Sequence, residues 1–109
     1  MRTVEEITVQ ELKKMQDNNE QVFLLDVREQ HEKDFVDIGG LLIPLNQLIK
    51  RLSEIESEKN NPVIIYCRSG ARSAEACRLL QSEGFSNVKN LRGGILKWSD
   101  DIDPDMPKY

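Results

Sequence analysis

One cysteine stands where a thiol can do chemistry. Cys67 follows a short apolar, β-branched run at residues 62–66, which is typical of a buried strand. A short loop with two arginines and a glycine comes next, and residues 71–83 then carry apolar side chains at helical spacing until Gly84. Backbone N–H groups of such a loop, together with the helix dipole, lower the pKa of a thiol and hold an anion beside it. We therefore interpret Cys67 as a reactive thiolate, against the alternative of a buried structural cysteine in a strand-to-helix turn.

The elements that must position this loop alternate along the chain. Apolar runs predict strands at residues 22–26, 41–43 and 62–66, and we also expect a short edge strand at residues 4–7 and a last short strand at residues 87–91. Helices are expected after a capping box formed by Thr8 and Glu11, at residues 29–35, at residues 71–83 and from the Gly93–Gly94 pair onward. Residues 46–55 are amphipathic through Leu48, Ile49, Leu52 and Ile55, and residues 100–109 are expected to be an irregular tail. This order predicts an α/β fold with a central, mostly parallel β-sheet flanked by helices.

Composition narrows the class of protein. A chain of 109 residues supports one domain, and 39% hydrophobic with 31% charged residues is typical of an ordinary globular protein. The net charge of −4 gives no general attraction to nucleic acid or to anionic membranes, so the relevant positive charge is local, at Arg68 and Arg72. No run is apolar enough for a membrane span, and the first residues have no signal-peptide core. Two cysteines and one histidine make neither a disulfide framework nor a zinc site, so we expect a cytoplasmic protein without metal or cofactor.

Four motifs follow one another in a fixed order. They are LDVRE at residues 25–29, GG at 39–40 before IPL at 43–45, YCRSGARS at 66–73, and LRGG at 91–94 leading to Trp98. Together they resemble the rhodanese, or sulfurtransferase, family over nearly the whole chain. Segments 37–40, 43–46 and 98–109 are similar in particular to the rhodanese domain of adenylyltransferase–sulfurtransferase fusion proteins. The resemblance implies that residues 1–109 form a single rhodanese-like domain.

The resemblance also implies a chemistry for this loop. Cys67 matches the catalytic cysteine, which takes a sulfane sulfur from a donor such as thiosulfate or a protein persulfide and passes it to a thiophilic acceptor. The rest of the active loop would bind the substrate, and it consists of Arg68, Ser69, Gly70, Ala71, Arg72 and Ser73. Asp26 and Arg28 leave a second strand end on the same side, and we expect them to support the site as an ion pair. The partners implied are a small sulfur donor or acceptor, a cysteine desulfurase, an E1-like adenylyltransferase or a sulfur-carrier protein.

Two other functions compete with this interpretation. The chain can be a relay module that is sulfurated only by a partner, as the likeness to fused domains suggests. It can also be a cysteine-dependent phosphatase, but that class needs an arginine six positions after the cysteine, where this chain has Ser73, and Arg72 falls one residue early. The family often has histidine where this chain has Asp37, which weakens any role for that position. We expect Cys77 to pack in the core and His31 to lie on the surface.

Overall fold

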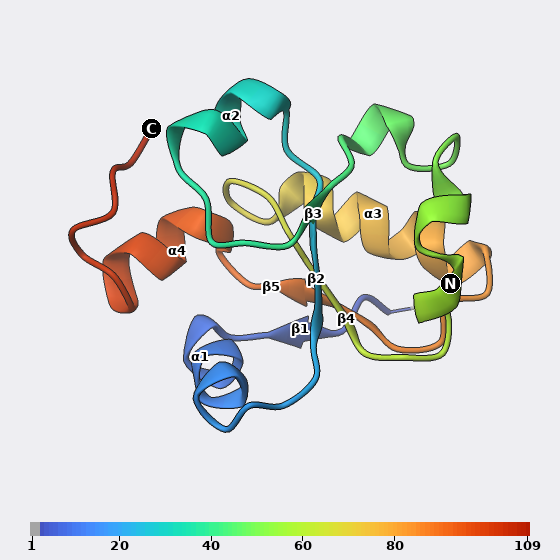
Figure 1. The fold of residues 1–109 in the computed structure, drawn as a ribbon, viewed down its shortest axis with the longest axis horizontal. Helices are drawn as coiled ribbons and strands as arrows, with labels where there is room; N and C mark the ends of the chain where they lie inside the picture. Colours follow the sequence, from blue (N-terminus) through green and yellow to red (C-terminus); the bar gives the residue numbers. More distant parts are fainter. Residues whose placement is uncertain (1–2) are drawn as a thin grey trace.

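Five strands form one parallel sheet in the computed structural model, which describes residues 3–109 (Figure 1). The strands are β1 (Glu6–Ile7), β2 (Phe23–Asp26), β3 (Leu41–Leu42), β4 (Val63–Tyr66) and β5 (Val88–Leu91). Their order across the sheet is β1-β5-β4-β2-β3, and every neighbouring pair is parallel. The predicted α/β fold with a parallel sheet is therefore confirmed, and the first strand lies at an edge as expected. Because β4 is central, the residue after it emerges from the middle of the sheet.

Four α-helices accompany the strands within residues 3–109. They are α1 (Val9–Asp17), α2 (Gln30–Phe35), α3 (Ala71–Ser82) and α4 (Gly94–Asp101). The predicted capping box is present at α1, where Thr8 Oγ1 accepts from the Glu11 amide at 3.1 Å and Glu11 Oε1 accepts from the Thr8 amide at 2.9 Å. Figure 1 shows α2 beyond the carboxyl ends of the strands, with the C-terminal segment returning beside it. None of the helices in residues 3–109 is both long and apolar enough to cross a membrane.

The side chains of β4 alternate between two separate cores. Val63 and Ile65 pack in a cluster with buried residues of α3, whereas Ile64 and Tyr66 pack in a second cluster with buried residues of α1 and α4. Both faces of the strand are therefore covered, which explains why its sequence is continuously apolar. Cys67 continues the alternation and belongs to the cluster on the α3 face. The strand thus aims the thiol at the start of the helix that follows it.

The structure differs from the sequence pattern over residues 46–55. Short 3₁₀ helices at Leu45–Gln47, Leu52–Glu54 and Glu56–Glu58 take the place of a regular amphipathic α-helix. Leu48 and Ile55 are fully buried as expected, and Leu52 is partly buried, but Ile49 is 50% exposed. A 3₁₀ turn holds three residues instead of 3.6, so an apolar face spaced for an α-helix loses one of its members.

Candidate active site

The sulfur of Cys67 lies beneath the first turn of α3. It accepts hydrogen bonds from the backbone amides of Gly70, at 3.1 Å, and of Ser73, at 3.4 Å, and Ser73 Oγ lies 3.3 Å away. Gly70 makes this turn possible because it precedes α3 with a φ of 111°, a left-handed conformation that side chains disfavour. Cys67 is only 1% exposed. The predicted inward-facing amides are therefore present, and they provide donors for negative charge on the sulfur.

The start of α4 holds the outer side of the same loop. The amide of Ile95 donates to the Cys67 carbonyl at 3.0 Å, and the amide of Leu96 donates to the Arg68 carbonyl at 3.1 Å. Gly94 permits this approach, because a Cβ on it would lie 2.6 Å from the Cys67 carbonyl oxygen and its φ is 60°. With its carbonyls turned toward α4, the loop leaves its amides free to face the sulfur. The Gly93–Gly94 pair, from which a helix was expected to begin, therefore also shapes the loop.

Asn90 is a buried polar residue of β5 that the sequence analysis did not single out. Its Nδ2 donates to the Gly70 carbonyl at 3.1 Å, and its Oδ1 accepts from Ser73 Oγ at 2.5 Å. One amide side chain thus links both ends of the turn that surrounds the Cys67 sulfur. The sequence gives only a weak signal for Asn90, because Lys89 beside it makes β5 polar at two of its four positions.

Arg72 forms a two-pronged ion pair with Glu32 of α2. Nη1 donates to Oε1 at 2.7 Å and Nη2 donates to Oε2 at 2.8 Å. The Arg72 hydrogen bonds lower the pKa of the Glu32 carboxyl to about 2, although its partial burial acts in the opposite direction. Glu32 also raises the pKa of Arg72, and the nearby charge of Cys67 adds to this effect. The sequence analysis missed Glu32, whose position in the chain resembles that of an ordinary helix residue.

The C-terminal segment closes over the loop through Tyr109. Arg68 Nε donates to the backbone oxygen of Tyr109 at 2.7 Å, Nη2 donates to the same atom, and the guanidinium carbon lies 5.2 Å from the centre of the Tyr109 ring. The Tyr109 hydroxyl donates to Glu32 Oε2 at 2.6 Å and accepts from Arg28 Nη1 at 3.1 Å. Beyond Asp101 the segment lacks helices and strands, much as predicted, but its contact with the site was not expected.

Asp26 and Arg28 form the predicted ion pair, with both side chains 0% exposed. Arg28 Nη2 donates to Asp26 Oδ2 at 2.8 Å and Nε donates to Oδ1 at 3.0 Å. Arg28 also donates to the backbone carbonyls of Glu32 and Val36. The hydroxyl of Tyr66 lies 3.1 Å from Asp26 Oδ2, and burial raises the pKa of this phenol. The pair is therefore enclosed, and it reaches the loop through Glu32, through Tyr109 and through Tyr66, the residue before Cys67.

The remaining candidate positions have simpler surroundings. Ser69 and Ala71 are exposed on the loop, and His31 is exposed on α2 as expected. Cys77 is fully buried, and burial raises the pKa of its thiol to about 12, which fits the predicted packing role. Asp37 accepts from the Gly39 amide at 2.7 Å and forms an ion pair with Lys33.

Across residues 3–109 no three side chains of His, Cys, Asp or Glu are grouped so as to hold a metal ion.

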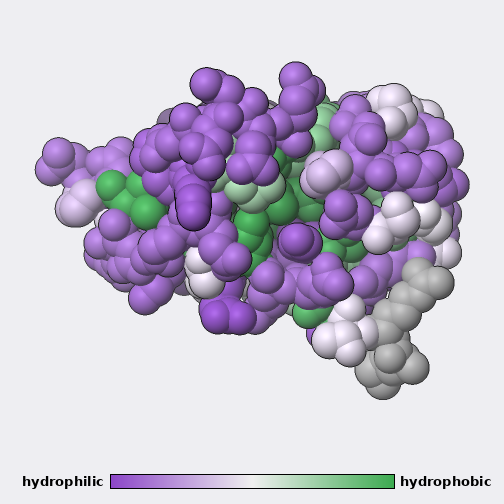
Figure 2. Space-filling view, turned by 90° about the horizontal axis from the view of Figure 1, so that it is seen from below, coloured by the Kyte–Doolittle hydropathy of each residue, from purple (hydrophilic) through white to green (hydrophobic). Residues whose placement is uncertain are grey.

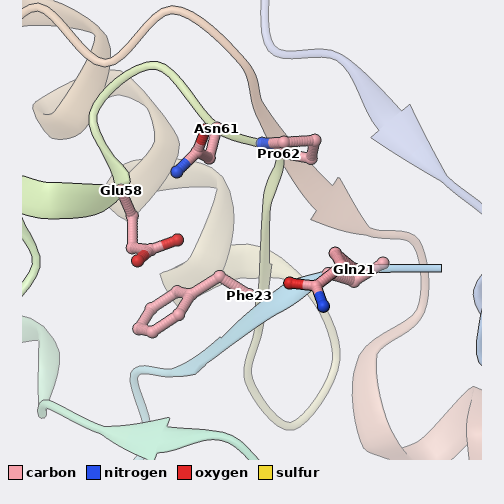
Figure 3. Close-up of a pocket in the computed structure, with 6 residues that line it drawn as sticks. Gln21, Phe23, Glu58, Asn61 and Pro62 are labelled. Carbon is pink, nitrogen blue, oxygen red and sulfur yellow. The ribbon is translucent and has the colours of Figure 1, made fainter. Parts of the chain in front are cut away.

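A hollow of about 360 Å³ lies at the opposite end of the sheet, where β2 and β4 begin. It is lined by Gln21, Val22, Phe23, Glu58, Asn61 and Pro62 (Figure 3). Figure 2 views the molecule from below and shows apolar surface at the centre of a mostly hydrophilic face. The lining residues include no thiol, hydroxyl or cationic side chain, so this hollow offers no counterpart to the chemistry around Cys67.

Comparison with known proteins agrees with this geometry. Residues 8–101 match the profile of the Rhodanese-like domain. The chain is 39% identical over 97 residues to a sulfurtransferase of Allochromatium vinosum, covering 88% of this chain and 89% of that protein. It is 37% identical over 109 residues to the adenylyltransferase and sulfurtransferase MOCS3-2 of Zea mays, covering 94% of this chain but only 23% of that protein. The crystal structure of a rhodanese-like domain protein from Staphylococcus aureus superposes with a TM-score of 0.81 at 27% identity, over 97% of this chain and 99% of that one.

Proposed function

The chain belongs to the rhodanese-like domain family, and on this basis we propose that it transfers a sulfane sulfur through a persulfide of Cys67. The observation that carries the proposal is the pair of backbone amides, from Gly70 and Ser73, that donate to the Cys67 sulfur at the start of α3. A neutral structural thiol needs no such donors, whereas a thiolate or a persulfide anion is stabilised by them.

In the first step the Cys67 thiolate attacks the outer sulfur of the donor. A new S–S bond forms, and the bond between the outer sulfur and the rest of the donor breaks. The leaving group, sulfite from thiosulfate or a thiolate from a persulfide, departs with the electron pair of that bond. Cys67 is left as a persulfide whose terminal sulfur carries the negative charge. The loop amides lie beside the sulfur both before and after the transfer, so hydrogen-bond donors stabilise the negative charge in both states.

In the second step the terminal sulfur passes to an acceptor. A nucleophile such as a thiolate or cyanide attacks this sulfur, the S–S bond to Cys67 breaks, and the Cys67 thiolate is restored. Both half-reactions are displacements at sulfur, so no net oxidant and no metal is required. The loop residues 68–73 form the binding surface in this proposal, with Asp26 and Arg28 as buried support.

Intact-mass measurement after incubation with thiosulfate or glutathione persulfide tests the assignment. Wild type and Cys77→Ser should each gain one sulfur atom, because Cys77 is a buried core residue. Cys67→Ser should gain none. Equal gain by Cys67→Ser would refute the role proposed for Cys67.

A second candidate is a relay that accepts sulfur only from a protein partner. It is favoured by one finding, that the chain spans about a quarter of the length of the fusion relatives it matches. The partners would then be a cysteine desulfurase as donor and an E1-like adenylyltransferase with its sulfur-carrier protein as recipients. Persulfide formation with a purified desulfurase and cysteine, but with neither small donor, would favour the relay over an independent enzyme.

A further inference from the structure

The positive charge beside Cys67 is matched by a negative one. Arg72 is one-third exposed and interacts electrostatically with Cys67. Both of its terminal nitrogens donate to Glu32, whose side chain is 8% exposed. A bidentate arginine–carboxylate pair is electrically neutral as a unit, and a partly buried one is weakly screened by salt. An anion that approaches Cys67 therefore meets an arginine whose positive charge is already balanced by the Glu32 carboxylate.

Other contacts fix this arrangement. The Tyr109 hydroxyl donates to the same carboxylate at Oε2, so Glu32 is held by two elements besides its own helix. Glu32 Oε1 also accepts from the Glu29 amide at 3.2 Å, which ties the carboxylate to the first turn of α2. Arg68 is turned toward the backbone oxygen of Tyr109. The Glu32 carboxylate is thus held next to Arg72 by the C-terminal segment and by the first turn of its own helix.

We propose that Glu32 is a specificity-determining residue that, by neutralising Arg72, disfavours doubly charged donors such as thiosulfate relative to thiol persulfides. This inference rests on the proposed sulfur transfer and names the class of donor that the site prefers. A thiosulfate ion brings two negative charges to the loop, whereas a thiol persulfide brings at most one at its sulfane sulfur. The Glu32 carboxylate therefore weakens the binding of thiosulfate more than the binding of a thiol persulfide.

Glu32→Gln is the informative variant. Glutamine has nearly the same shape, and its Oε1 can accept from the Glu29 amide and from Arg72 Nη1, so the variant removes the charge and keeps these two contacts, whereas its amide nitrogen cannot accept from Arg72 Nη2 or from the Tyr109 hydroxyl. Asp34→Asn is the matched control, because Asp34 lies on the same helix but is exposed and accepts from Gln30 instead. Both variants change the net charge equally.

Sulfate serves as a non-reacting dianion, and its binding is read from protection of Cys67 against iodoacetamide, located by peptide mass. We expect Glu32→Gln to lower the sulfate concentration for half-protection about five- to tenfold. The reason is that the variant removes one negative charge near the bound dianion and so removes its repulsion. Asp34→Asn should change it less than about twofold. The KM for thiosulfate should fall in parallel with the sulfate effect, while the KM for cysteine persulfide changes less.

Unchanged or weaker sulfate protection in Glu32→Gln would overturn the inference, since Glu32 would then only orient Arg72. An equal gain in Asp34→Asn would also overturn it, because the effect would be one of net charge alone. The protection assay requires no sulfur transfer, whereas failure of wild type to gain sulfur from any donor would refute the proposed function. The two failures are therefore distinguishable.

Discussion

Gly94→Ala tests whether the start of α4 shapes the loop that surrounds Cys67. In the present fold Gly94 has a φ of 60°, and a Cβ there would lie 2.6 Å from the Cys67 carbonyl oxygen and against the Arg68 carbonyl. The added methyl group cannot be accommodated by a side-chain movement, because the atoms it meets belong to the backbone. The loop or the helix must move apart.

The size of the effect follows from two contributions. A non-glycine residue in the left-handed region costs roughly 1–2 kcal/mol. Separation of α4 from the loop weakens the hydrogen bonds from Ile95 and Leu96 to the loop carbonyls, at about 0.5–1.5 kcal/mol each. We therefore expect Gly94→Ala to lower the free energy of unfolding by about 2–5 kcal/mol, a large share of the ordinary stability of a small domain.

Gly39→Ala is the matched control. Gly39 has a φ of 99°, but a Cβ there would have no neighbour within 4 Å, so only the backbone contribution of about 1–2 kcal/mol should appear. Urea unfolding followed by fluorescence of the buried Trp98 measures both variants. Folded Gly94→Ala should also gain sulfur at Cys67 more slowly than Gly39→Ala. Equal destabilisation by the two substitutions, with equal sulfur gain, would refute the reasoning.

Three further predictions concern charge and loop geometry. Asp26→Asn should destabilise the fold by about 3–5 kcal/mol in urea unfolding, because it leaves the buried Arg28 without its counter-ion, and a loss below about 1 kcal/mol would contradict this. The Glu32 carboxyl has its pKa lowered from 4.5 to about 2, so its charge stabilises the fold above pH 4.5 and this stabilisation is lost as the pH falls from 4.5 toward 2. The stability difference between wild type and Glu32→Gln should accordingly be constant near neutral pH and shrink on acidification, and a difference that grows there would have the wrong sign. Hydrolysis of an aryl phosphate should be negligible, since Arg72 falls one residue early for a phosphate loop, and Cys67-dependent hydrolysis faster than sulfur transfer would reverse that ranking.

Local patterns in the sequence were sufficient to predict most of the strands and helices of this protein. Continuous apolar runs marked β2 and β4, because both faces of these central strands are covered in the parallel sheet. The turn from β4 to α3 was visible because glycine, arginine and serine interrupt the apolar pattern over a few residues. Thr8 and Glu11 marked the start of α1 through contacts only three residues apart. All these signals act between near neighbours in the chain, which is why sequence reasoning could use them.

Tertiary structure alone decided which charges meet around Cys67. Glu32 reaches Arg72 across 40 positions of the chain, and Tyr109 reaches Glu32 across 77. No pattern of spacing encodes such pairs, because they depend on how α2 and the C-terminal segment come together over the strand ends. The same holds for Asn90, which joins the loop only because β5 lies beside β4. The sequence by itself determined that a thiol stands at the end of a buried strand, and the packing of distant segments decided the electrostatic setting in which that thiol acts.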